Sequence, residues 1–163
     1  MKKIFILATF LLFSSLSFGQ NDKICLKSIE NKIQIGQMMG NRNLTFGFKN
    51  ILLEYLQEKD LQLVDSCNLS DLQLQIELIY FDVLKTNSGF SVIHKENDET
   101  VLRVKGKLIN SNGKKVKETL VTEKSSEISM STLIIAEGGK INQQSVSNVI
   151  KKCCETLIKN LFG

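Results

Sequence analysis

The stretch at residues 71–85, DLQLQIELIYFDVLK, is the feature that most constrains the fold. In its first half, apolar residues at the even positions from 72 to 80 alternate with Gln73, Gln75 and Glu77. A period of two is typical of a strand with one buried face. Beyond Glu77 the odd positions, Ile79 among them, become apolar as well, which we interpret as a far half covered on both faces. Such a strand would be roughly 50 Å long at about 3.3 Å per residue, so we expect it to bend or to outrun its sheet.

Residues 1–19 are predicted to be a secretory signal peptide. Lys2 and Lys3 precede an apolar run over 4–13, and 17–19 supply small residues at the two positions that a signal peptidase reads. The apolar run is shorter than the about 20 residues that cross a bilayer. We therefore expect an exported chain, periplasmic or secreted, with no transmembrane segment after cleavage.

The mature chain, 20–163, is expected to form a single domain. Loss of Lys2 and Lys3 lowers the number of basic residues from 21 to 19, against 17 acidic ones. This near-neutral balance gives no electrostatic reason to expect binding to nucleic acid or to an anionic membrane. Asp22-Lys23-Ile24 precedes Cys25 in place of the small apolar residues of a lipidation site, so no lipid anchor is expected.

The remaining periodicity predicts the order β-α-β-β-β-β-α. Strands are expected at 24–35, 61–64, 71–85, 101–109 and 115–123, and amphipathic helices at 44–59 and 146–161, capped by Asn43 and Ser145. Asn112 and Gly113 predict a hairpin turn. We interpret the polar segment 86–100 as a long connection, while 125–144 carries no clear pattern. The order indicates an α+β two-layer sandwich: a mostly antiparallel sheet of four to six strands with both helices on one face. The first strand should lie beside the strand that follows the first helix.

The mature chain has four cysteines: Cys25, Cys67, Cys153 and Cys154. Adjacent cysteines on a helix point about 100° apart, so Cys153 and Cys154 are not expected to bond each other. Two interpretations remain open, packing of these thiols in the core and a disulfide from Cys25 or Cys67 to the last helix. Neither a Cys-x-x-Cys motif nor a histidine partner supports a metal site.

No catalytic set is indicated by the sequence. His94 is the single histidine, and it falls in the polar segment 86–100, where a solvated side chain is the expectation. Glu77 is the one carboxylate expected to be partly covered, and no second acid is fixed beside it. Gly138-Gly139-Lys140 lacks the spacing of a phosphate-binding loop. We therefore expect neither enzymatic activity nor a cofactor.

Two apolar segments fall outside the regular core and are candidate contacts with a partner protein. The residues concerned are Phe90, Val92, Ile93, Leu133, Ile134 and Ile135. Either they pack on the sheet as an extra hairpin, or they form an exposed docking surface.

In architecture, the chain resembles small periplasmic accessory proteins: the lipopolysaccharide-assembly lipoprotein LptE, the YajG-type lipoproteins and the N-terminal domain of curli-secretion-type proteins. The shared features are the helix over 43–59, the strands over 61–64, 71–85 and 101–109, and the late helix from Ser145. The resemblance implies an accessory role in the cell envelope through an envelope protein partner. We expect binding by strand addition at a sheet edge. The alternative is a small-ligand or lipid binder with an apolar pocket near Phe48, Tyr55, Tyr80 and Phe81.

Overall fold

The computed structural model describes residues 23–35, 44–59, 61–90, 93–131 and 143–163; for 34–35, 85–90, 93–98 and 127–131 it describes the backbone alone. The elements are β1 (Lys23–Ile35), α1 (Thr45–Glu58), β2 (Gln62–Leu63), the 3-10 turn η1 (Cys67–Leu69), β3 (Leu72–Phe90), β4 (Ile93–Asn110), β5 (Lys115–Ser131) and α2 (Gln143–Phe162). The predicted order β-α-β-β-β-β-α is confirmed. The signal peptide, Asn43 and the segment 133–135 lie outside the described residues.

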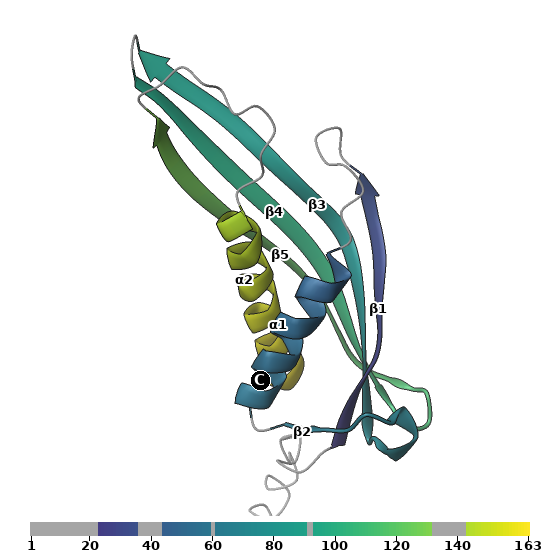
Figure 1. Ribbon diagram of the computed structural model, residues 1–163. Coiled ribbons are helices and arrows are strands. Elements are labelled where there is room, and N and C mark those ends of the chain that lie inside the picture. Colours follow the sequence, from purple (N-terminus) through teal and green to yellow (C-terminus); the bar gives the residue numbers. More distant parts are fainter. Residues whose placement is uncertain (1–22, 36–43, 60, 91–92, 132–142) are drawn as a thin grey trace, which may run out of the picture.

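The strands form one mixed sheet in the order β2-β1-β3-β4-β5. β1 runs parallel to β2 and β3, whereas β3, β4 and β5 form consecutive antiparallel pairs. The expected pairing of the first strand with the strand after the first helix is confirmed by Lys23 opposite Gln62. Both helices lie on the same side of this curled sheet (Figure 1). We call that side the inner face and the opposite side the outer face.

A β-bulge at Ile79 explains the change of pattern in β3. Leu78 lies opposite Val104 and Tyr80 opposite Arg103, so Ile79 has no partner of its own on β4. One extra residue exchanges the two faces of a strand, because side chains alternate with a period of two. Our interpretation that the far half is covered on both faces was therefore wrong.

The exposures on either side of the bulge agree with this exchange of faces. Before it, even positions such as Leu78 are buried on the inner face; after it, the buried side chains are Phe81 and Val83. Leu84, which lies on the outer face, is 50% exposed. The expected bend is present, since β3 follows the curl of the sheet (Figure 1), but β3 does not outrun its sheet, because it stays paired with β4 up to Phe90.

Deletion of Ile79 is expected to be tolerated, with a loss in the free energy of unfolding below about 2 kcal/mol, because it leaves every paired residue on its present face. Deletion of Gln75 is the matched control. This deletion would shift the alternation, so that either Ile76 and Leu78 or the residues before them would turn out of the core. Exposing two large apolar side chains should lower the free energy of unfolding by about 4 kcal/mol or more. Urea unfolding of both variants measures the difference, and equal losses would contradict the bulge.

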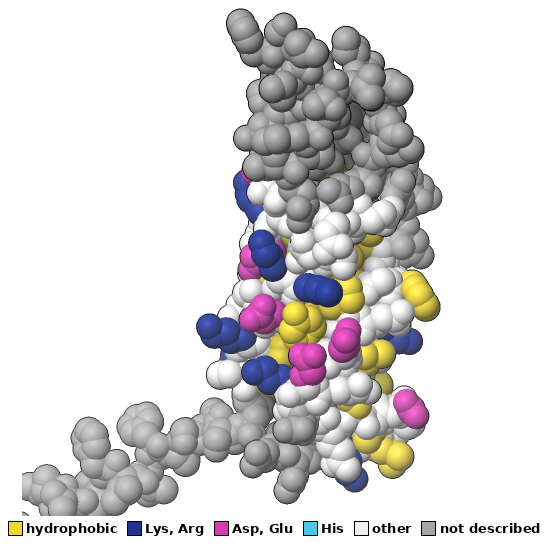
Figure 2. Space-filling model, turned by 60° about the vertical axis from the view of Figure 1, so that its left-hand side comes forward, with side chains coloured by type: hydrophobic (Ala, Val, Ile, Leu, Met, Phe, Trp, Pro, Cys, Tyr) yellow, Lys and Arg dark blue, Asp and Glu magenta, His cyan; other side chains and the backbone are white. Residues whose placement is uncertain are grey.

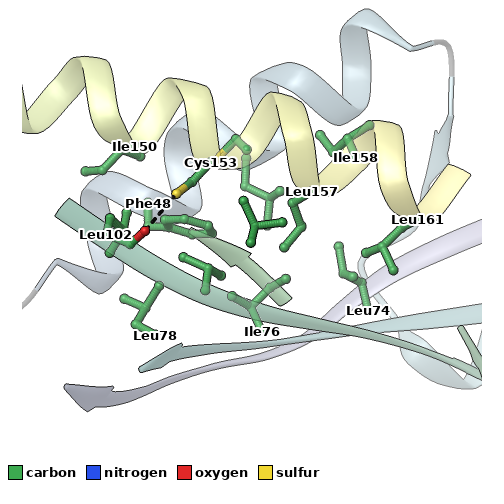
Figure 3. Packing of buried hydrophobic residues seen from close by; sticks show 14 of the residues in the cluster. Phe48, Leu74, Ile76, Leu78, Leu102, Ile150, Cys153, Leu157, Ile158 and Leu161 are labelled. Atoms are coloured by element: carbon green, nitrogen blue, oxygen red, sulfur yellow. Dashed lines mark hydrogen bonds between the residues drawn. The ribbon is translucent and has the colours of Figure 1, made fainter. Parts of the chain in front are cut away.

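The core lies between the inner face and the two helices (Figure 3). Phe48 and Leu52 of α1 and Leu157 and Leu161 of α2 are fully buried. The sheet contributes buried residues from each long strand: Ile24, Leu72, Leu74, Ile76, Leu78, Leu102, Val104, Leu108 and Val121. α2 passes close over Gly106 of β4, where an added Cβ would lie 2.9 Å from Leu157 Cδ1.

Two sequence expectations about element ends are corrected. The segment 86–100 is mostly strand, because β3 continues to Phe90 and β4 begins opposite it at Ile93. Main-chain hydrogen bonds between paired strands do not require apolar side chains, so hydropathy missed this extension. Ser145 is not a cap but lies inside α2, where its hydroxyl is buried and 2.7 Å from that of Thr100. Leu44 occupies the cap position of α1, with no side-chain capping bond.

Candidate binding surface on the outer face and free edge of the sheet

No helix of the described residues lies on the outer face, which presents polar side chains from four strands. Its described members include Glu30, Lys32, Gln75, Glu77, Tyr80, Asp82, Leu84, Arg103, Lys105, Lys107, Glu118, Leu120, Thr122 and Lys124. Figure 2 shows one side of the molecule, on which basic, acidic and hydrophobic side chains are interspersed. No single-sign patch of the kind that attracts nucleic acid is visible there, in agreement with the near-neutral composition.

Ion pairs cross this face from strand to strand. Glu77 of β3 lies 3.1 Å from Lys32 of β1 and 2.9 Å from Lys107 of β4. Hydrogen bonds from Lys107 and then Lys32 hold the pKa of the Glu77 carboxyl below its ordinary value. The side chain of Glu77 is 19% exposed, which confirms that this carboxylate is partly covered. Its lysine partners neutralise it, so it is suited to joining strands and not to moving protons.

Glu118 of β5 makes the second such pair, with Lys105 at 2.5 Å and Lys115 at 2.8 Å. Hydrogen bonds from Lys105 and Lys115 lower the pKa of its carboxyl from 4.5 to about 2. Because the folded-state pKa is depressed, the pairing stabilises the fold above the ordinary pKa, and this contribution is lost as the pH falls toward about 2.

We expect Glu118 to titrate with a midpoint near 2 in carboxyl-carbon NMR at low ionic strength. The variant Lys105→Gln should raise this midpoint because it removes the first of the two cations, and added salt should raise it as well. A wild-type midpoint in the ordinary range for glutamate at low salt would show that these lysines do not hold the carboxylate.

The bulge places an aromatic-cation cluster on the outer face. Tyr80 donates from its hydroxyl to Asp82 Oδ2 at 3.0 Å, and Asp82 Oδ1 accepts the Val83 backbone N–H at 2.9 Å. The guanidinium carbon of Arg103 lies 5.8 Å from the centre of the Tyr80 ring, and its Nε donates to Thr122 Oγ1 at 3.1 Å. The hydrogen bond to Asp82 raises the pKa of the Tyr80 hydroxyl, so this group stays a neutral donor at neutral pH.

β5 forms one edge of the sheet. In the sheet formed by the described residues, β4 pairs with one edge of β5 and no strand pairs with the other. The strand is 17 residues long, from Lys115 to Ser131. Half of the backbone N–H and C=O groups along such an edge point away from the sheet, where they can pair with an added strand. At residues 124 and 125 the carbonyls instead accept from Lys152 Nζ and Ser145 Oγ of α2. Lys117 and Lys124 lie on it, and charged residues of this kind discourage non-specific pairing between edges. Leu120, between them, is 58% exposed.

The cysteines divide into one disulfide and two buried thiols. Cys25 of β1 is bonded to Cys67 of η1, which corrects the expected link from either of them to the last helix. Cys153 and Cys154 are unbonded and buried, as the core interpretation predicted. Burial raises the pKa of the Cys153 thiol to about 12 and that of Cys154 further still. Neither thiol is therefore a nucleophile or a thiolate ligand at neutral pH.

Within the described part of the chain, no group of three or more metal-ligating side chains is found. His94 lies on β4 opposite Gly89 and not in a loop, which corrects its predicted placement; its side chain is outside the described set. The buried hydroxyls of Thr100 and Ser145 lie 2.7 Å apart, and Ser145 Oγ donates to the backbone carbonyl of Ser125 at 3.3 Å.

Of the four residues of the alternative ligand pocket, only Tyr80 is separated from the rest by the sheet, since Tyr55 packs against the core that contains Phe48 and Phe81. Phe48 and Phe81 are buried in the core on the inner face. Tyr80 lies on the outer face, on the other side of the sheet. The bulge is the physical reason, because it exchanges the faces of Tyr80 and Phe81 relative to an unbroken alternation.

The predicted partner contacts are only partly described. Phe90 and Ile93 lie opposite each other where β3 and β4 join. Val92, Leu133, Ile134 and Ile135 lie outside the described residues. Arg103, which lies over the Tyr80 ring and donates to Thr122, was not singled out from the sequence. The signal that could have revealed it is the change from even to odd apolar positions at Ile79.

No protein-family model matches the chain. Comparison with curated proteins finds no match either. Among described residues, no helix is long and apolar enough to cross a membrane.

Several solved structures are similar in fold. The minor lipoprotein of Acinetobacter baumannii matches 86% of this chain and 90% of its own, with a TM-score of 0.51 and 14% identity. The hypothetical protein CT253 of Chlamydia trachomatis matches 88% of this chain and 96% of its own, with a TM-score of 0.52 and 9% identity. The PelC dodecamer of Paraburkholderia phytofirmans matches 85% of this chain and 87% of its own, with a TM-score of 0.50 and 17% identity. The likeness to bacterial lipoproteins is thus one of fold; kinship with LptE, YajG or curli-secretion proteins stays a prediction.

Proposed function

We propose that the chain is an exported, non-enzymatic accessory protein of the cell envelope that binds a partner protein along the free edge of β5. The observation that carries the proposal is that edge: β5 is 17 residues long, and within the described sheet no strand lies beyond it. An extended segment of a partner could continue the sheet there through main-chain hydrogen bonds, and the side chains beside the edge would select it.

Export is supported by the disulfide and by the predicted signal peptide. Disulfides persist mainly in oxidising compartments such as the periplasm and the extracellular space. Because Cys25 is bonded to Cys67, its sulfur is not free to carry a lipid, and this supports a mature protein without an anchor. The similar fold of a minor lipoprotein of Acinetobacter baumannii supports a place in the envelope.

Assembly with protein partners is supported by PelC, whose structure of similar fold is a dodecamer. We retain Phe90, Val92 and Ile93 and the segment Leu133, Ile134 and Ile135 as proposed further contacts. Absence of enzymatic activity is part of the proposal, and it is supported by the buried, protonated thiols and by the lysine-neutralised glutamates.

Site-specific photo-crosslinking tests the edge. A benzoylphenylalanine at Leu120 of β5, 58% exposed, is compared with one at Phe46 of α1, 75% exposed, in cells that naturally carry the protein. We expect a discrete protein adduct from position 120 and none of that mass from position 46. Adducts of the same mass from both positions, or an adduct from position 46 alone, would contradict binding at β5.

A further inference from the structure

We propose that Arg103 and the side chains around it form a recognition site for a carboxylate flanked by apolar groups, as an acidic side chain of a partner protein would present. The inference deepens the proposed function and rests on it, because it states the chemistry that the partner carries. It concerns the outer face and not the main-chain edge of β5.

Arg103 is held in place before any ligand arrives. Its side chain is fixed from two neighbouring strands, by the ring of Tyr80 on β3 at 5.8 Å and by Thr122 on β5, which accepts from Nε at 3.1 Å. A guanidinium fixed in this way loses little conformational entropy when it binds, and it keeps the donors at its terminal nitrogens.

The nearby carboxylates are bound to other groups and do not pair with Arg103. Asp82 accepts from Tyr80 and from the Val83 backbone. Glu99 lies 2.7 Å from Lys124, and Glu118 is paired with Lys105 and Lys115. None of the salt bridges among the described residues involves Arg103, whose side chain is exposed. Its planar pair of terminal N–H groups therefore remains able to bind an external carboxylate in a bidentate manner.

Exposed leucines lie on the same face as Arg103. Leu120, two residues from Thr122 on β5, is 58% exposed, and Leu84, farther along the face and four residues from Tyr80 on β3, is 50% exposed. Arginine and tyrosine beside exposed apolar side chains are the composition of a protein-binding hot spot. A phosphate-rich surface prefers clustered free cations, whereas here Lys105 and Lys124 are each paired with a glutamate. The charge pattern thus favours a single carboxylate over a lipid headgroup.

The test uses the tripeptides acetyl-Leu-Glu-Leu-amide and acetyl-Leu-Gln-Leu-amide on the mature protein, followed by NMR. Arg42 and Arg103 are the two arginines of the chain, so the Nε–H signal of Arg103 is readily assigned. We expect the Glu peptide to shift this signal and the Thr122 amide saturably, with the Gln peptide about tenfold weaker, since a charge-assisted bidentate bond is lost. In Arg103→Lys, the Thr122 shift should weaken by a similar factor, whereas Lys124→Gln, the matched control, should retain it.

Three results would overturn the proposal. They are equal shifts by the two peptides, full binding by Arg103→Lys, and tighter Arg103-dependent binding to phosphatidylglycerol vesicles or inorganic phosphate than to the Glu peptide. Both variants should unfold at the wild-type temperature, which separates recognition from folding. Because the peptide assay requires no natural partner and the crosslinking assay does not involve Arg103, failure of one is distinguishable from failure of the other.

Discussion

Replacement of Gly106 by valine is expected to lower the free energy of unfolding by about 3 kcal/mol. A Cβ at this position would lie 2.9 Å from Leu157 Cδ1 and 3.1 Å from Leu161 Cδ1, both of which are fully buried. Alanine needs only a small rotation of the leucines, but the branched methyl groups of valine would push α2 away from β4. Urea unfolding of the purified variants measures this loss.

A double-mutant cycle identifies the cause of that loss. Leu157→Ala alone should cost about 3 kcal/mol through the cavity it leaves. Combined with Gly106→Val, it should cost clearly less than the sum, because the valine then fills space that Leu157 vacates. Gly47 of α1 is the control glycine: an added Cβ there meets nothing within 4 Å. Gly47→Ala should stabilise the helix by up to about 1 kcal/mol. Strict additivity in the cycle would show that α2 does not pack on Gly106.

Loss of the disulfide is expected to have a comparable effect. Cys25 and Cys67 are 42 residues apart, and a loop of that length corresponds to about 4 kcal/mol of lost chain entropy in the unfolded state. The double variant Cys25→Ser/Cys67→Ser should lose roughly this amount of unfolding free energy. Its urea m-value should also rise, since the unfolded chain becomes less compact. The free energy, and not the midpoint alone, is therefore the quantity to compare.

The buried thiols supply the control for this variant. Cys154→Ala removes one small buried group, with an expected loss of about 1 kcal/mol, and leaves the disulfide intact. Dithiothreitol should bring the wild-type protein to the stability of the double variant, while the double variant itself should not respond. Two results together would contradict this: a free energy of unfolding of the wild-type protein that the reductant does not change, and an equal value for the double variant. They would mean that the disulfide between β1 and η1 has no part in stability.

The order of elements could be predicted because each core segment follows its own hydrophobic period. The helix near 44–59 and the hairpin at Asn112 and Gly113 depend on short-range patterns, and both are present. The prediction of a long connection over 86–100 was wrong because this segment forms strands that are held by pairing with their neighbours, and hydropathy does not record pairing. The far half of β3 was misinterpreted because two-sided burial and a one-residue bulge produce the same run of apolar letters.

The candidate site was less accessible from the sequence than the fold. A free edge depends on which strand is outermost, and that follows from the whole topology, not from the residues of β5. Arg103 becomes notable only when Tyr80 is known to face it, which requires the bulge at Ile79. The disulfide partner of Cys25 likewise depends on the parallel placement of β1 beside β3, which brings η1 against the same end of the sheet.

Amide hydrogen exchange of the isolated mature protein tests most directly the claim that the sheet is open at β5. Amides of the interior strands β3 and β4, such as those of Leu74 to Leu78, should exchange slowly. Along Lys117 to Lys124 every second amide should exchange fast, because its N–H points away from β4 with no strand beyond it in the described sheet. Uniformly slow exchange along β5 would mean that another strand already covers this edge, and would contradict the account.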